Sequence, residues 1–126
     1  MVKIAKQGFV WHELMTTDVM GAKKFYEEVT GLTTTPGDYQ MMMSGDKPVG
    51  GLTGPRKEGP GWPSGGPEPH WIPYIGVPDA AAAAKKAAEL GGKVLLPPTD
   101  IPGMGQAAVL RDPQGAAFGV FTAVPG

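Results

Sequence analysis

Two neighbouring side chains near the start of the chain, His12 and Glu13, are of the types that bind divalent metals or move protons. Imidazole nitrogens and carboxylate oxygens are common ligands of catalytic metals, and both groups act as general acids and bases. The only other histidine of the sequence is His70. Whether these three side chains can act together depends on the elements that position them.

The stretch around His12 and Glu13 is predicted to be a strand, because residues 9–17 are rich in β-prone types. Successive side chains of a strand point to opposite faces of its sheet. His12 and Glu13 therefore cannot chelate one metal together. Trp11 and Met15, in contrast, each lie two positions from Glu13 and share its face.

The composition indicates a single soluble domain and argues against several classes of function. The chain has 126 residues and no cysteine, which excludes disulfides and thiolate ligands and predicts a cytoplasmic protein. Eleven basic and twelve acidic side chains give a net charge of −1, so neither nucleic acid nor a membrane is an expected partner. The N-terminal stretch lacks the long apolar run of a signal peptide or membrane span.

The first half of the sequence predicts a strand, a helix and further short strands. Asp18 follows the first strand as a helix N-cap, and Gly31 ends the helix. An apolar stripe with helical spacing runs along this helix and consists of Ala22, Phe25, Tyr26 and Val29. Strands are expected at residues 39–44 and 47–54.

A loop and a second set of elements follow. Residues 55–69 are too rich in Gly and Pro for a helix or strand, and are predicted to be a linker or a functional flap. A strand at 70–77 leads to the N-cap Asp79 and an Ala-rich helix that ends at Gly91 and Gly92. The last strands are expected at residues 93–98, 105–112 and 115–123, with a turn at 112–115.

The two halves repeat each other at an offset of 61 positions. The shift carries Asp18 onto Asp79, Gly31 onto Gly92 and Pro36 onto Pro97. Because the same predicted elements stand between these landmarks, the sequence predicts two tandem βαβββ modules. The expected single domain, residues 1–126, comprises module one at about 8–54, the loop 55–69 and module two at about 70–123.

Two such modules in a chain of this length resemble the vicinal oxygen chelate superfamily, which includes glyoxalase I, bleomycin-resistance proteins and extradiol dioxygenases. The resemblance is carried by "ELMTTDVMGAKKFYEEVTGL" and by "YIGVPDAAAAAKKAAELGGKVLLPPTDIPGMGQAAVLRDPQGAAFGVF". The Asp-Pro-Gln-Gly turn followed by Phe-Gly is typical of the small glyoxalase-like branch. The resemblance implies an α+β fold in which the modules form a curved mixed sheet around a cup. It does not fix the chemistry, because this scaffold carries lyases, epimerases, dioxygenases and binders.

Enzymes of the family hold a divalent metal in the cup with four His or Glu side chains, and this sequence lacks them. By the family's spacing, the first ligand lies seven residues before Asp18, which is Trp11 here, and its repeat partner is Ile72. The second-module carboxylate falls on Gly119, and its first-module equivalent is Gly51. None of these side chains offers a metal a lone pair, so no metal or other cofactor is expected.

A metal site rebuilt from other residues is the alternative. His70 lies two residues from Ile72, and Tyr74 is the repeat partner of Glu13, so the resemblance places them all on the cup face. Glu13 and His70 supply two ligands, fewer than the three that a catalytic metal normally has. Glu13 could instead be a desolvated general base, or a structural acceptor bonded to Tyr74, Tyr39 or a backbone amide.

Aromatic side chains favour a ligand site without a metal. Trp11 and Tyr74 could stack on a planar ligand, with Met15 and the methionines at 41–43 as adaptable wall, although the same residues could simply fill the core. Trp62 in the loop is expected to cover a pocket or a partner, because an exposed Trp lowers solubility. The candidate ligand-binding residues are therefore Trp11, Glu13, Met15, Tyr74, His70 and Trp62.

The sequence leaves two main functions open, and with them the question of enzymatic activity. The first is a homodimeric binding protein that holds a small aromatic or apolar metabolite, with a second subunit covering apolar faces and strand edges. The second is a metal-dependent lyase, isomerase or dioxygenase of glyoxalase type that uses Glu13 and His70. A metal-free enzyme with Glu13 as its base is a third. Trp71 is expected to point away from the cup, toward a helix or the subunit interface.

Overall fold

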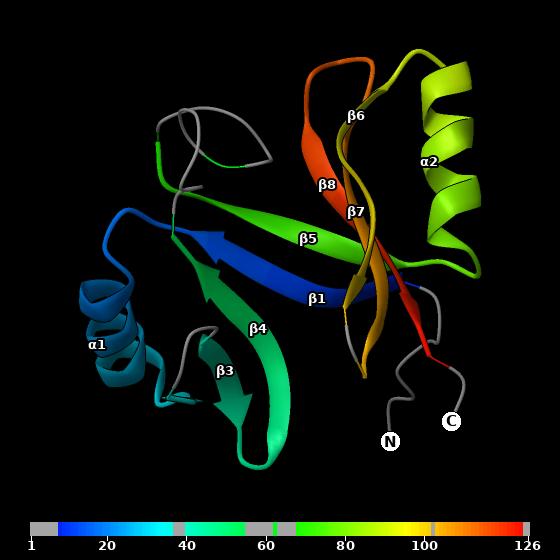
Figure 1. Ribbon diagram of the computed structural model, residues 1–126. Coiled ribbons are helices and arrows are strands. Elements are labelled where there is room, and N and C mark those ends of the chain that lie inside the picture. Colours follow the sequence, from blue (N-terminus) through cyan, green and yellow to red (C-terminus); the bar gives the residue numbers. More distant parts are fainter. Residues whose placement is uncertain (1–7, 37–39, 55–61, 63–67, 102, 125–126) are drawn as a thin grey trace. The chain divides into compact units, whose positions relative to one another are not determined.

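The computed structural model describes residues 8–36, 40–54, 62, 68–101 and 103–124, and in these residues it contains two helices and eight strands (Figure 1). The first module comprises β1 (Gly8–Met15), α1 (Val19–Thr30), β2 (Thr33–Thr34), β3 (Gln40–Ser44) and β4 (Lys47–Thr53). The second comprises β5 (His70–Gly76), α2 (Ala80–Glu89), β6 (Lys93–Ile101), β7 (Gly105–Arg111) and β8 (Ala117–Ala123). The predicted α+β fold with two tandem βαβββ modules is confirmed.

The chain divides into two compact units, and the boundary between them falls within β1 and within β5. The α1 unit holds the described residues within 11–62 and 66–72, which include the first three residues of β5. The α2 unit holds the start of β1 and the described residues from 73 onward. The interpretation of the chain as one domain stays a prediction, and most of the loop 55–69 lies outside the described residues.

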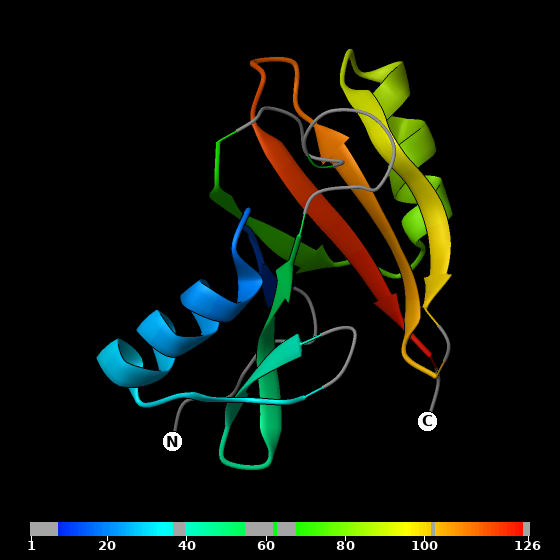
Figure 2. The ribbon, with the colours of Figure 1, turned by 60° about the vertical axis from the view of Figure 1, so that its left-hand side comes forward.

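The α1 unit is built on four strands in the order β2-β3-β4-β1. Figure 2 shows β3 and β4 joined as a hairpin. β1 runs parallel to β4, while β3 is antiparallel to both β2 and β4. In this register Glu13 lies opposite Gly51, and Gly51 lies opposite Met41 on its other side. Because directly paired residues point to the same face of a sheet, these three residues share one face.

Helix α1 covers the other face of this sheet. The helix begins where the carboxylate of Asp18 accepts from the Gly21 amide at 2.9 Å, and it ends at Gly31, which has a positive φ of 79°. Against it lie the buried side chains of Leu14, Met42 and Leu52, which alternate in their strands with the row of Glu13. The two faces of β1 therefore have different tasks, since one builds the core and the other carries Trp11 and Glu13.

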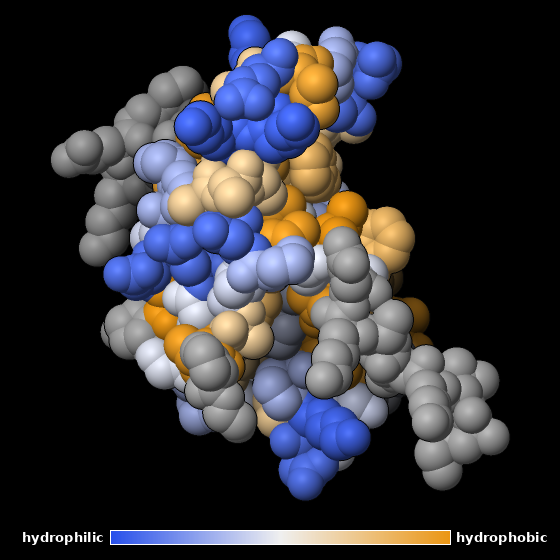
Figure 3. Space-filling model, turned by 90° about the vertical axis from the view of Figure 1, so that its right-hand side faces the viewer, coloured by the Kyte–Doolittle hydropathy of each residue, from blue (hydrophilic) through white to orange (hydrophobic). Residues whose placement is uncertain are grey.

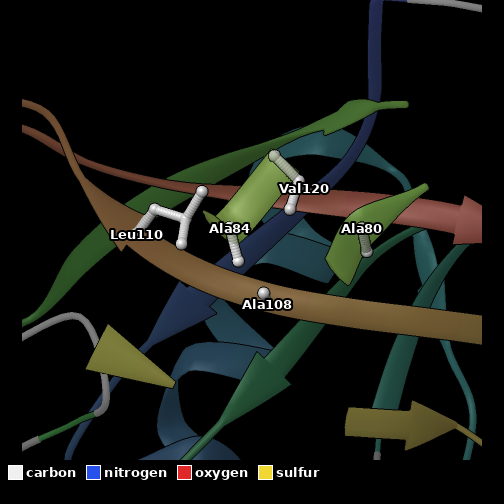
Figure 4. Packing of buried hydrophobic residues seen from close by; sticks show 5 residues of the cluster. All are labelled: Ala80, Ala84, Ala108, Leu110 and Val120. Carbon is white, nitrogen blue, oxygen red and sulfur yellow. The ribbon is translucent and has the colours of Figure 1, made fainter. Parts of the chain in front are cut away.

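The α2 unit repeats this plan with a tighter core. Its strands follow the order β5-β8-β7-β6, with β5 parallel to β8. Asp79 caps α2 by accepting from the Ala82 amide, and Gly91 follows the helix with a φ of 93°. The core cluster is formed by Ala80, Ala84, Ala108, Leu110 and Val120 (Figure 4). Alanines on both α2 and β7 allow the helix backbone to approach the sheet closely.

The exposed side of this unit is mixed in character. Figure 3 looks onto the side that carries α2 and shows hydrophilic side chains at the upper end, at mid-height and at the lower end of the view, with hydrophobic ones between them. Among the described residues, no helix has the length and apolarity needed to cross a bilayer.

The structure differs from the sequence expectations in several places: β1 ends at Met15 rather than at residue 17, β2 lies where no strand was predicted, and β6 continues to Ile101 rather than ending at residue 98. β8 begins at Ala117 rather than at residue 115, because the Asp112 carboxylate accepts from the amides of Gln114 and Ala116 and holds both in the turn. The apolar stripe of α1 is only partly used in packing. Tyr26 packs against the sheet, but Phe25 and Val29, predicted as part of the same stripe, are exposed.

A matched pair of leucines tests the α2 unit core. Leu110 is 1% exposed and Leu90 is 67% exposed. Leu110→Ala is expected to lower the free energy of unfolding by about 2–5 kcal/mol, because it removes packed methyl groups and leaves a cavity. Leu90→Ala should change it by less than about 0.5 kcal/mol. Urea unfolding measures both, and similar losses for the two variants would contradict the assigned core.

Candidate functional site

The candidate site lies on the face of β1 that carries Trp11 and Glu13. Glu13 is only 5% exposed, and its carboxylate accepts hydrogen bonds from Trp11 and Thr53. The Trp11 indole donates from Nε1 to Oε1 at 2.9 Å, and the Thr53 hydroxyl donates to Oε2. A buried carboxylate needs such donors, since its desolvation is otherwise costly. The three side chains therefore form one hydrogen-bonded group.

The register of β1 and β4 explains why these side chains meet. Trp11 and Glu13 are two positions apart on one strand, so their side chains stand on the same face. Gly51 lies directly opposite Glu13 and has no side chain, and Thr53 is its next neighbour on that face. The carboxylate can thus extend diagonally across Gly51 to the Thr53 hydroxyl.

This arrangement supports the structural-acceptor interpretation of Glu13, with donors that the sequence did not identify. Thr53 was not among the expected partners, and neither was the indole of Trp11. Tyr39, one of the suggested donors, lies outside the described residues. The signal that could have identified Thr53 is its place two positions after Gly51, the residue aligned with the family's carboxylate position.

His12 and His70 are placed differently from each other. His12 is exposed, while its neighbour Leu14, which points to the same face, packs toward α1. His70 is half-buried, and its Nδ1 donates to the Glu68 carbonyl at 2.8 Å, which fixes the proton on Nδ1. As the strand rule predicted, His12 does not share the face of Glu13.

Trp62 lies against His70 rather than being exposed in the loop. Its side chain is 1% exposed, and its ring meets the His70 ring edge-to-face, with centroids 5.5 Å apart. Trp62 was expected to cover a pocket or a partner. In the structure its ring contacts His70 within the α1 unit. The structure joins Trp62 with His70, and it joins Trp11 with Glu13.

The methionines divide between the two faces. Met15 is buried and lies on the face of Glu13, as the sequence indicated. Of the run 41–43, Met41 is in the row of Glu13 and Gly51, whereas Met42 belongs to the cluster against α1. The prediction that the whole run adds to a ligand wall is therefore wrong for Met42, because side chains alternate along β3.

The strand registers support the alignment of Gly51 with Gly119. Glu13 lies opposite Gly51, and Tyr74, the repeat partner of Glu13, lies opposite Gly119. The same position in the two modules is thus occupied by glycine. Neither glycine can supply the carboxylate that the resemblance associates with this position.

The space beside Gly119 is filled by the ring of Tyr74. A Cβ on Gly119 would overlap Cδ2 and Cε2 of that ring. No side chain can stand at position 119 while Tyr74 keeps this conformation. The ring therefore takes the place that a carboxylate at 119 would need.

The residues at the four inherited positions do not fit a divalent metal. Trp11 and Ile72 have no side-chain lone pair for a metal, and Gly51 and Gly119 have no side chain. Ile72 is itself fully buried in packing. Within the described ranges, no three or more His, Cys, Asp or Glu side chains come together as a metal-binding group.

Thr53→Val tests the hydrogen-bonded group on β1. The variant removes one donor to a buried carboxylate at nearly constant volume, and it should lower the free energy of unfolding by about 1–3 kcal/mol. Thr99→Val is the control, because the Thr99 hydroxyl is exposed and bonds only locally, to the Pro97 carbonyl. Equal small effects in thermal and urea unfolding would contradict a role for Thr53 in holding Glu13.

Gly119→Ala tests the contact with Tyr74. The added methyl group must displace the ring, so the variant should lose about 1–3 kcal/mol of unfolding free energy. In a Tyr74→Ala background the same substitution should cost at least about 1 kcal/mol less, since the obstructing ring is gone. A cost that is equal in both backgrounds would show that another contact excludes side chains at 119.

Comparison with known proteins identifies the family to which this chain belongs. The model of the glyoxalase-like domain matches residues 11–121. CFP32 of Mycobacterium tuberculosis, whose name describes it provisionally as a glyoxylase, is 43% identical over 122 residues, which cover 92% of this chain and 44% of that protein. DnrV of Streptomyces peucetius, named an anthracycline biosynthesis protein, is 32% identical over 134 residues, with 96% and 49% covered.

The chain spans about half the length of these relatives. Among solved structures, the Mn(II)-bound glyoxalase of Novosphingobium aromaticivorans superposes with a TM-score of 0.63 at 19% identity, over 91% of this chain and 38% of that one. An identity this low shows a shared fold and nothing more. The family model and the relatives confirm the glyoxalase-like resemblance seen in the sequence: the chain belongs to the glyoxalase-like family.

Proposed function

We propose that the protein binds a small aromatic or apolar metabolite on the β1 face that carries Trp11, without a metal, in the cytoplasm. The proposal rests on one observation above all. The position that the family's spacing gives to the first metal ligand holds an indole ring, and that ring is tied by its N–H to the buried Glu13 carboxylate at 2.9 Å. The absence of cysteine supports the cytoplasmic location.

A fixed indole ring is well suited to bind a planar ligand. Aromatic rings gain from stacked and edge-to-face contacts beyond the area that they bury. A ring already held by a hydrogen bond loses less conformational freedom when a ligand arrives, which favours binding. In this proposal Glu13 orients Trp11, and Met15 and Met41 supply polarizable surface on the same face.

The name of one relative agrees with this ligand class. DnrV is named for anthracycline biosynthesis, and anthracyclines contain planar, fused aromatic rings. The inference to this chain concerns the class of ligand alone. The alternative, a metal-dependent enzyme, has to use Glu13 and His70 with a third ligand, and the Glu13 carboxylate already accepts from Trp11 and Thr53.

A binding experiment tests the proposal. The protein is titrated with neutral fused-ring compounds, naphthol and hydroxyanthraquinone, while tryptophan emission and melting temperature are followed. Binding of a member of the panel should raise the melting temperature. Trp11→Ala should weaken that binding by about tenfold or more, because it removes the stacking ring. His12→Ala, one position along on the opposite face, should leave it unchanged.

Two results would contradict the proposal. One is a panel in which no compound changes either signal. The other is stoichiometric metal in untagged protein after dialysis against a mixture of divalent cations, measured by elemental mass spectrometry. About one metal ion per chain that is lost in Glu13→Gln would favour the metal-dependent enzyme instead.

A further inference from the structure

His70 lies on the face of the α1 unit that carries Glu13, and the position of its neighbour Trp71 shows this. Trp71 packs beside a helix, as predicted. Its ring meets Tyr26 of α1 edge-to-face with centroids 5.4 Å apart, and its Nε1 donates to the Tyr26 hydroxyl at 3.3 Å. Trp71 is therefore on the side of the sheet that α1 covers. Because side chains alternate along β5, His70 points to the opposite side, which is the face of Glu13.

The His70 ring is held in place by two contacts. Its Nδ1 donates to the Glu68 carbonyl at 2.8 Å, and the ring of Trp62 meets it edge-to-face with centroids 5.5 Å apart. Trp62 is 1% exposed, so this neighbour is itself fixed by packing. With the proton on Nδ1, Nε2 of the neutral ring is a hydrogen-bond acceptor. His70 thus provides a half-buried acceptor in a fixed orientation.

The donor hydrogens of the described side chains around Glu13 are directed at the protein itself. The indole of Trp11 has one N–H and the side chain of Thr53 has one O–H, and both are donated to the Glu13 carboxylate. The Nδ1 hydrogen of His70 is donated to the Glu68 carbonyl. These side chains therefore present acceptor atoms and a carboxylate to a ligand. A ligand that brings its own donor complements such a face, whereas an anionic ligand does not.

We propose that His70 determines ligand specificity at this face, because its Nε2 accepts the hydroxyl hydrogen of an uncharged hydroxyarene, a planar aromatic compound with a phenolic O–H. The inference rests on the function proposed above, in which an aromatic ligand binds against Trp11. It narrows the ligand class from aromatic or apolar compounds to those with a phenolic donor. A site built to bond a ligand hydroxyl rejects the analogue that lacks it more strongly than an apolar pocket rejects a missing methylene.

Three probes with the same ring system test the ligand class. Naphthol carries the donor, naphthalene lacks it, and naphthoate carries a carboxylate in its place. Equilibrium dialysis at neutral pH measures the dissociation constant of each. Naphthol should bind about tenfold more tightly than naphthalene, because it gains one hydrogen bond. Naphthoate should bind more weakly than naphthalene, because its charge is repelled by Glu13.

Two substitutions of His70 separate the acceptor from the anchor. The amide of an Asn reaches the place of Nδ1 and can still donate to the Glu68 carbonyl, but it has no atom at the place of Nε2. The amide of a Gln reaches the place of Nε2 and can still accept. His70→Asn should therefore weaken naphthol binding about tenfold and leave naphthalene binding unchanged, while His70→Gln should keep the preference for naphthol. His12→Asn, on the opposite face, is the control and should change neither.

The outcomes distinguish this inference from the function on which it rests. A preference for naphthol that disappears in His70→Asn and persists in His70→Gln supports the inference. Equal binding of naphthol and naphthalene to the natural chain overturns it while the binding function stands. The same conclusion follows if the preference survives in His70→Asn, or if that variant loses both compounds to the same extent. If none of the three probes binds, the proposed function fails, and the role of His70 fails with it.

Discussion

The alternation of side chains along β1 is the constraint on which both faces of the α1 unit depend. One set of positions, with Leu14, supplies the core beneath α1, and the other presents Trp11 and Glu13. Because Glu13 is buried on its face, it requires donors, and two positions that can supply them are the next residue on the same face of β1 and the diagonal neighbour on β4. Trp11 and Thr53 occupy those positions. A shift of register by one residue would place the carboxylate among the apolar side chains of the core.

The two modules use the same glycine position in different ways. In the first module, Gly51 leaves space that the Glu13 side chain crosses to reach Thr53. In the second, the ring of Tyr74 lies over Gly119 and leaves no room for a Cβ. A position without a side chain thus allows its neighbour on the adjacent strand to spread over it. The repeat has kept its backbone register while the chemistry of this face has changed between modules.

Local signals in the sequence were sufficient to predict both helices, most of the strands and the repeat, although they missed β2 and the end of β6. Asp18 and Asp79 cap helices, Gly31 ends one with a positive φ, and the Asp112 turn joins the last two strands, since each depends on contacts a few residues apart. Contacts between distant segments were not predictable in the same way. The bond from Thr53 to Glu13 requires the β1–β4 register, and the burial of Trp62 against His70 requires the path of a long loop.

The contrast between the two helices explains why a helical stripe in the sequence could not be assigned wholly to the core. Both helices follow a strand, begin at an Asp N-cap and end near glycine. In α2 the residues Ala80 and Ala84 are buried, whereas no residue of α1 is buried. Small side chains let α2 sit close to β7, whereas Val19, Ala22 and the larger Tyr26 pack α1 against its sheet while staying partly exposed. Phe25 and Val29 cannot reach the sheet from that position. Helical spacing identifies which residues share a side of the helix, but the size of the side chains at the contact decides how much of that side is buried. The apolar surface left on α1 therefore follows from the packing of Tyr26, which at the same time fixes Trp71 beside it.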